Sequence, residues 1–172
     1  MTTLIESIRA EYVRYKALAD AAIAQVTDAD LATGGPGHRN SISTICWHVS
    51  GNLQSRFTDF LTSDGEKPWR RRDEEFLPRT TTRADLLAKW NIGWSVLFDT
   101  LSGLSDDDLD GTVTIRGQAM RVHEALHRSL AHTAYHVGQI VYVAKMLRGP
   151  DWTFLSIPPG QSDSHEPPAT SH

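Results

Sequence analysis

The chain has 172 residues, a length that suits one domain with a single core. Its formal net charge of -4 excludes the basic surface that is typical of nucleic-acid-binding proteins. It contains no apolar run near the about 18 residues that a membrane span needs and no leader-like opening, so we expect a cytoplasmic protein without nucleic-acid or membrane partners.

Two segments in the first third of the chain have the periodicity of amphipathic helices. The first, residues 3–26, opens with the capping-box pattern Thr3-Leu-Ile-Glu6. A Gly-Gly-Pro-Gly breaker at 34–37 separates it from the second, residues 41–61, whose apolar side chains form one stripe. The single cysteine, Cys46, lies in this second segment, so an intramolecular disulfide is excluded and the thiol is expected to be a small buried hydrophobe.

A loop rich in charge and proline, residues 63–81, precedes the third predicted helix. We expect its Arg70-Arg71-Arg72 run to be solvated. The third helix begins at the cap Thr82-Arg-Ala-Asp85 and ends at Ser102-Gly103.

The last third of the chain combines a short extended piece with a long helix. Residues 112–117, TVTIRG, are β-branched and short, which predicts half of a small hairpin. The fourth helix is predicted from about Met120 to Arg148, where Gly149-Pro150 ends it. The fold class is therefore all-α: an up-down four-helix bundle with a small extended segment before the last long helix. We expect this domain to cover residues 1–155, followed by a Pro-rich C-terminal tail, 156–172.

Residues 123–136, HEALHRSLAHTAYH, contain two overlapping histidine pairs at a spacing that allows one metal ion to bind both rings. The first pair, His123-Glu-x-x-His127, matches the zincin protease signature. That signature also needs a downstream ligand: Leu130 and Thr133 stand where its extended form has glycine and histidine, and no further glutamate occurs before the tail. The protease interpretation is therefore disfavoured.

The second pair, His132 and His136, has a possible third ligand. On a helical wheel, His136 lies roughly 65° from the centre of the apolar stripe and His127 roughly 115° from it. His48 lies at the edge of the stripe of the second helix, so three imidazoles from two facing helices could form one site. From spacing alone, a metal site and three unrelated, hydrogen-bonded or solvent-facing histidines remain equal alternatives.

Two motifs resemble the DinB-like (YfiT-like) superfamily of small metal-binding four-helix proteins. They are Cys46-Trp-His48-Val-Ser-Gly-Asn52 and Leu130-Ala-His132-Thr-Ala-Tyr-His136-Val-Gly-Gln-Ile140. Residues 51–60, 64–69 and 155–160 are similar to one bacterial branch of unknown function, and the similarity covers nearly the whole chain.

This resemblance implies a divalent metal ion, zinc or nickel, held by His48, His132 and His136. It also implies a low-molecular-weight thiol as cosubstrate, because characterised relatives are thiol S-transferases and a thiol-dependent isomerase. A borderline-soft ion suits that chemistry since it stabilises a thiolate near neutral pH. Members of the superfamily often form homodimers.

The leading hypothesis is a metal-dependent enzyme that acts on a small molecule, with thiol transfer as its chemistry. Polar residues expected around the ligands are Asn52, Arg56, Tyr135 and Gln139, and for each of them a structural role is favoured over a catalytic one. Metal-assisted hydrolysis is one alternative. Another is a non-enzymatic binding protein that a closed four-ligand site would stabilise, with a tail histidine, His165 or His172, as the fourth ligand.

Overall fold

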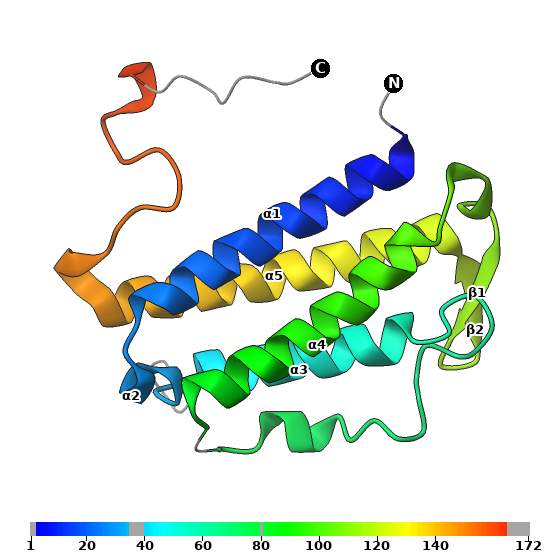
Figure 1. Ribbon diagram of the computed structural model, residues 1–172, viewed down its shortest axis with the longest axis horizontal. Helices are drawn as coiled ribbons and strands as arrows, with labels where there is room; N and C mark the ends of the chain where they lie inside the picture. Colours follow the sequence, from blue (N-terminus) through cyan, green and yellow to red (C-terminus); the bar gives the residue numbers. More distant parts are fainter. Residues whose placement is uncertain (1–2, 35–39, 80, 165–172) are drawn as a thin grey trace.

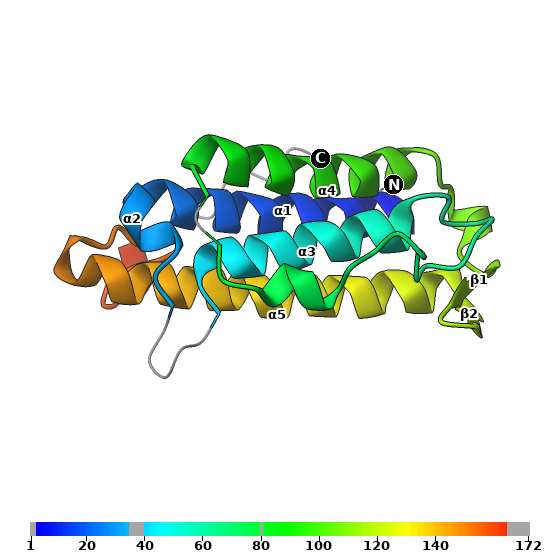
Figure 2. The same ribbon diagram turned by 90° about the horizontal axis from the view of Figure 1, so that it is seen from below.

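The computed structural model describes residues 3–34, 40–79 and 81–164, and it confirms the expected all-α bundle (Figure 1). The four-residue helix at Asp28–Leu31 was not expected. Four long helices pack side by side along the molecule (Figure 2). The helices are α1 (Leu4–Gln25), α2 (Asp28–Leu31), α3 (Ile42–Phe57), α4 (Arg83–Ser102) and α5 (Val122–Arg148), with 3-10 turns at Asp73–Phe76, Asp106–Asp108, Gly149–Asp151 and Ser162–Ser164.

The helix starts are close to the positions that the sequence predicts. In the capping box of α1, the Glu6 amide donates to Thr3 Oγ1 (3.2 Å) and the Thr3 amide donates to Glu6 Oε2 (2.8 Å). Thr82 caps α4 in a similar way through the Asp85 amide (3.1 Å). The end of α3 comes earlier than predicted, at Phe57 rather than near residue 61.

The extended piece forms an antiparallel hairpin of β1 (Thr112–Ile115) and β2 (Gln118–Arg121). Its two turn residues, Arg116 and Gly117, have φ values of 55° and 72°. Such left-handed pairs favour a type I′ turn with glycine second. Because Met120 belongs to β2, α5 begins two residues later than predicted.

The long connection between α3 and α4 runs back along the bundle, so that α4 starts near the same end of the bundle as α3 (Figure 1). Ser50 bonds to the Lys89 carbonyl near the start of α4, and Thr100 donates to the Phe57 carbonyl near its end, so α3 and α4 are parallel. Of the consecutive long helices, only the pairs α1–α3 and α4–α5 are therefore antiparallel, as an up-down bundle requires, whereas α3 and α4 are parallel. Antiparallel α3 and α5 face each other, which brings distant parts of the sequence together.

The core lies between the four long helices and is centred on large aromatic side chains. Tyr12, Trp90 and Trp94 are almost fully buried, with exposed fractions of 0%, 0% and 1%. The Tyr12 hydroxyl donates to the Leu126 carbonyl (3.2 Å), and the Trp90 indole donates to Asp20 (2.8 Å). Burial of these aromatic surfaces, together with the buried aliphatic side chains around them, stabilises the bundle.

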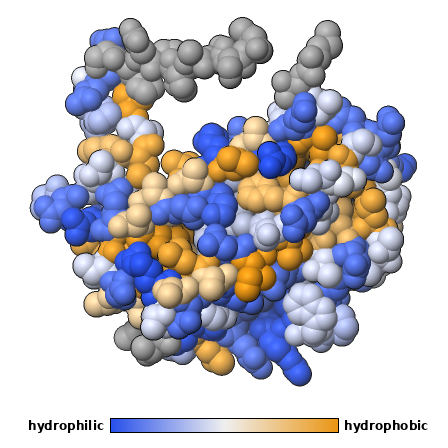
Figure 3. Space-filling model, viewed as in Figure 1, coloured by the Kyte–Doolittle hydropathy of each residue, from blue (hydrophilic) through white to orange (hydrophobic). Residues whose placement is uncertain are grey.

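On the surface, hydrophilic and hydrophobic residues are interspersed over the face seen in Figure 3. Among the described helices, none has the length and apolar character needed to cross a bilayer.

Candidate metal centre

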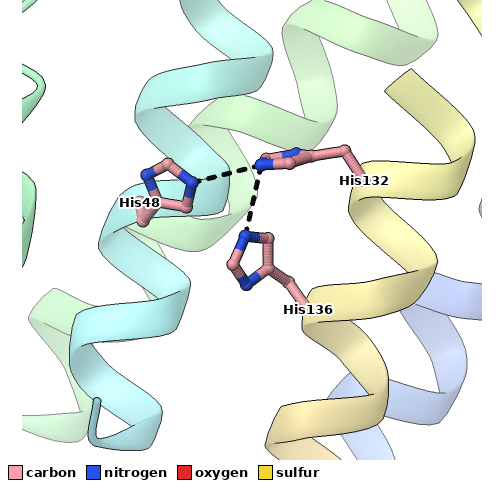
Figure 4. Close-up of side chains that lie close together, drawn as sticks. All are labelled: His48, His132 and His136. Carbon is pink, nitrogen blue, oxygen red and sulfur yellow. Dashed lines mark hydrogen bonds between the residues drawn. The ribbon is translucent and has the colours of Figure 1, made fainter. Parts of the chain in front are cut away.

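Three imidazole rings point toward one another between α3 and α5 (Figure 4). His48 lies on α3, and His132 and His136 lie one turn apart on α5. His132 Nε2 lies 3.2 Å from His48 Nε2 and 3.2 Å from His136 Nε2, and all three nitrogens lie within 4.8 Å of one another. Nitrogens bound to a tetrahedral Zn²⁺ at about 2.0–2.1 Å are separated by about 3.3 Å, and the two separations that involve His132 match this value.

The His48 ring is oriented by a buried carboxylate. Glu75 Oε2 lies 2.8 Å from His48 Nδ1, and because an ionised carboxylate only accepts hydrogen bonds, Nδ1–H donates. Arg70 donates to both oxygens of Glu75, through Nε to Oε1 (2.8 Å) and through a terminal nitrogen to Oε2 (2.9 Å). Burial raises the pKa of Glu75, but the hydrogen bonds from His48 and Arg70 outweigh it, and the net effect lowers the pKa. In the neutral ring, this tautomer leaves the Nε2 lone pair of His48 on the side of His132.

Glu75 reaches His48 from the 3-10 turn Asp73–Phe76, which packs on α3. A β-carbon at Gly51 would overlap with Oε1 of Glu75, so only glycine leaves room for this approach. Phe76, next in the chain, packs its ring 4.6 Å from the His48 ring. Arg72 lies over the Phe76 ring at 5.1 Å. The turn therefore covers the outer side of His48 with both a hydrogen-bond acceptor and an apolar surface.

His136 has a matching arrangement on α5. Its Nδ1 lies 2.8 Å from Gln139 Oε1, an acceptor three residues further along the helix, so Nδ1–H donates and Nε2 keeps its lone pair. Burial lowers the pKa of His136 to about 4. Burial first, and then the neighbouring His136 and His48, lower the pKa of His132 to about 3.

These protonation states make the cluster a set of metal donors. Neutral His132 can donate through Nε2 to only one of its two neighbours, so at least one 3.2 Å contact joins two lone pairs. His132 Nδ1 is buried and has no hydrogen-bond partner in the described part of the chain. A cation bound by all three Nε2 atoms would remove the lone-pair repulsion. Neutral imidazoles are the ligands that zinc and nickel accept.

The zincin pair lies apart from this cluster, near the start of α5. His123 Nδ1 donates to the Leu109 carbonyl (2.9 Å), and His127 is exposed. Glu124 accepts the Arg121 amide (2.8 Å) as a helix cap. Neither histidine belongs to a group of possible metal ligands among the described residues. Both have ordinary structural or surface positions.

Cys46 is fully buried, and burial raises the pKa of its thiol, so the thiol stays protonated. The expectation of a small buried hydrophobe is confirmed.

The other polar residues expected near the ligands have different surroundings. Asn52 and Arg56 follow His48 along α3 and line a cavity of about 170 Å³ that opens beside His48 and His132. Tyr135 is 63% exposed, with its ring 4.9 Å from that of His136. His165 and His172, named as possible fourth ligands, lie outside the described residues.

The sequence does not predict that Glu75 and Arg70 belong to this site. Both come from the loop before α4, where no periodicity indicates which side chains point inward. The expectation that the arginine run is solvated is wrong for Arg70, whose side chain is only 2% exposed because it pairs with buried Glu75.

A family model described as "Protein of unknown function (DUF1572)" matches residues 1–161. The chain belongs to this family. The match spans both elements of the site, so α3 and α5 of this DUF1572 chain, with their three histidines, are part of the family domain. Comparisons with curated proteins and with solved structures give no match. The family description states no activity.

Proposed function

We propose that the protein is a metal-dependent enzyme in which His48, His132 and His136 hold one divalent ion, zinc or nickel. The observation that carries the proposal is the convergence of three Nε2 atoms, two of which belong to rings that donate their Nδ1–H to an acceptor. Such acceptors fix the tautomer and raise the basicity of metal-binding histidines. A structural role alone would not require three lone pairs to face one point.

The site also has access for a small molecule. A cavity borders His48 and His132, which favours a metal ion with one coordination position open to a ligand. A purely structural zinc site is instead closed by four protein ligands. An open position favours an enzyme over a metal-stabilised binding protein. When bound, the ion would supply Lewis acidity that favours a thiolate over a thiol.

Thiol transfer to an electrophile is the reaction that we propose first, on the basis of the resemblance to the DinB-like superfamily, in which we propose to include this family. The sulfur lone pair forms a bond to the electrophilic carbon, and the bond from that carbon to its leaving group breaks. The leaving group departs with the electron pair, and the thiol proton passes to the buffer. Glu75 and Gln139 act as positioning residues that hold His48 and His136 in place.

Metal analysis of untagged protein tests the site. The expected result is about one zinc or nickel per chain in the wild type, with loss of metal in His48→Ala, His132→Ala and His136→Ala. His127→Ala is the matched control, because this exposed histidine lies on the same helix as two of the ligands. Loss of metal only in His127→Ala would favour the protease signature and overturn the proposal.

The reaction is tested separately with metal-loaded protein, small thiols and a general electrophile. Thiol consumption should exceed that of the metal-free protein and disappear in His132→Ala. A parallel assay with a chromogenic ester identifies hydrolysis instead. No rate in either assay, with metal bound, would favour the non-enzymatic class.

A further inference from the structure

The cavity beside the three histidines has an unusually cationic wall. Five arginines line it, and no acidic residue does. They come from α3, the loop before α4, the hairpin turn and α5: Arg56, Arg70, Arg72, Arg116 and Arg128. His48 and His132 line the same cavity, so the positive wall and the candidate metal ligands border one space.

Nearby carboxylates balance only part of this charge. Arg70 is paired with Glu75, while Arg56 and Arg116 share Glu66 at 3.0 and 2.9 Å. Arg72 contacts Asp73 at 3.3 Å, a carboxylate whose side chain is 99% exposed. Among the described residues, the five guanidinium groups thus form ion pairs with three carboxylates.

Arg128 is the guanidinium available to a ligand. It has no hydrogen bond or ion pair with any residue that the structure describes, and it is exposed to solvent at the cavity. It lies one turn before His132 on α5, and Arg56 lies two turns after His48 on antiparallel α3. Both helices therefore present arginine on the same side of the histidine cluster, toward the hairpin.

Asn52 provides an independent indication of a polar ligand. Its side chain lines the cavity, is only 9% exposed and forms no hydrogen bond with the described residues. The amide therefore borders the open cavity and offers two donors and one acceptor to whatever occupies it. It lies between His48 and Arg56, one turn from each.

We propose that this cavity binds the oxyanion of a small-molecule substrate, a carboxylate or a phosphate, through Arg128, Arg56 and Asn52. Guanidinium groups match both oxyanions because they donate two parallel hydrogen bonds. The remainder of the substrate then lies beside His48 and His132. The identification of this anion as part of a substrate rests on the proposed function, whereas binding of the anion itself does not require a metal.

Calorimetric titration of the full chain with inorganic phosphate and with succinate, at constant ionic strength, tests the proposal. Saturable binding of at least one anion is expected, and the tighter of the two identifies the oxyanion class. Arg128→Gln and Asn52→Ala should each weaken binding by about tenfold, since a charged hydrogen bond or a buried polar contact is lost. Arg14→Gln is the control, because Arg14 is paired with Glu11 on the surface of α1, away from the cavity.

The same titration after treatment with a chelator separates this proposal from the proposed function. If the protein holds no metal but Arg128→Gln still weakens anion binding, the cavity assignment stands and the metalloenzyme assignment fails. Two results would overturn the cavity assignment: no saturable binding of either anion, or equal affinities in the wild type and Arg128→Gln. An equal loss of affinity in Arg14→Gln would also overturn it, since it would indicate only a general charge effect.

Discussion

Gly51 leaves the space that the Glu75 carboxylate occupies beside His48. A β-carbon at position 51 would overlap with Oε1 of Glu75, the oxygen that also accepts from Arg70. Because Gly51 has no side chain, Glu75 can approach α3 from the loop and orient the ring of His48, which lies one turn before Gly51 on that helix.

Gly51→Ala should displace Glu75 and weaken metal binding by about 10–100-fold, the usual effect of losing an acceptor behind a ligand histidine. Competition with a chromophoric chelator measures the affinity. Gly138→Ala is the matched control, because a β-carbon at this helical glycine meets no atom within 4 Å. Equal affinities for Gly51→Ala and the wild type would show that Glu75 does not support the site.

Glu75→Ala should also destabilise the fold. It leaves the Arg70 guanidinium, 2% exposed, without its counter-ion, and an uncompensated buried charge costs about 3 kcal/mol. Urea unfolding of the metal-free protein measures the change. The double variant Arg70→Ala/Glu75→Ala should be less destabilised than the sum of the two single variants, because no unpaired charge remains. Strictly additive losses would contradict this pairing.

Acid should destabilise the metal-free protein between about pH 6.5 and pH 4. The pKa values of His132 and His136 in the folded state, about 3 and about 4, lie below the ordinary value of about 6.5. In this window the unfolded chain binds protons that the folded chain does not, so the free energy of unfolding falls as the pH falls. His132→Gln should make this dependence shallower, as measured by urea unfolding at several pH values. His127→Gln should leave it unchanged, and a wild-type slope in His132→Gln would contradict the assignment.

Close packing of α3 against α4 gives a prediction that does not involve the metal site. A β-carbon at Gly93 would lie 2.6 Å from the Ser50 α-carbon, which is backbone and cannot rotate away. Gly93→Ala should therefore push the parallel helices apart and lower the free energy of unfolding by about 1–3 kcal/mol. Thermal unfolding checks this, again with Gly138→Ala as control. A stability equal to that of the control would contradict the parallel contact.

The sequence predicts the elements better than it predicts their relative placement. Apolar periodicity and caps at Thr3 and Thr82 locate the long helices, because these signals are local. The i, i+4 spacing of His132 and His136 places them on one face for the same reason. Whether His48 meets them depends on the register between α3 and α5, which spacing cannot fix.

Glu75 shows the other limit of the sequence. It lies 27 residues beyond His48 in an irregular loop, and only the path of that loop back along α3 brings it to the ring. The same path buries Arg70, so a run of three arginines that resembles a solvated segment contributes to the site instead. Contacts made by a long connection have no periodic signature.

X-ray absorption at the zinc edge, on zinc-loaded protein, tests most directly whether His48, His132 and His136 hold one ion. Three imidazole nitrogens are expected at about 2.0–2.1 Å, with the remaining position filled by a light atom, and one imidazole fewer in His48→Ala. A spectrum with a sulfur ligand from the protein, or one that His48→Ala leaves unchanged, would contradict this three-histidine site.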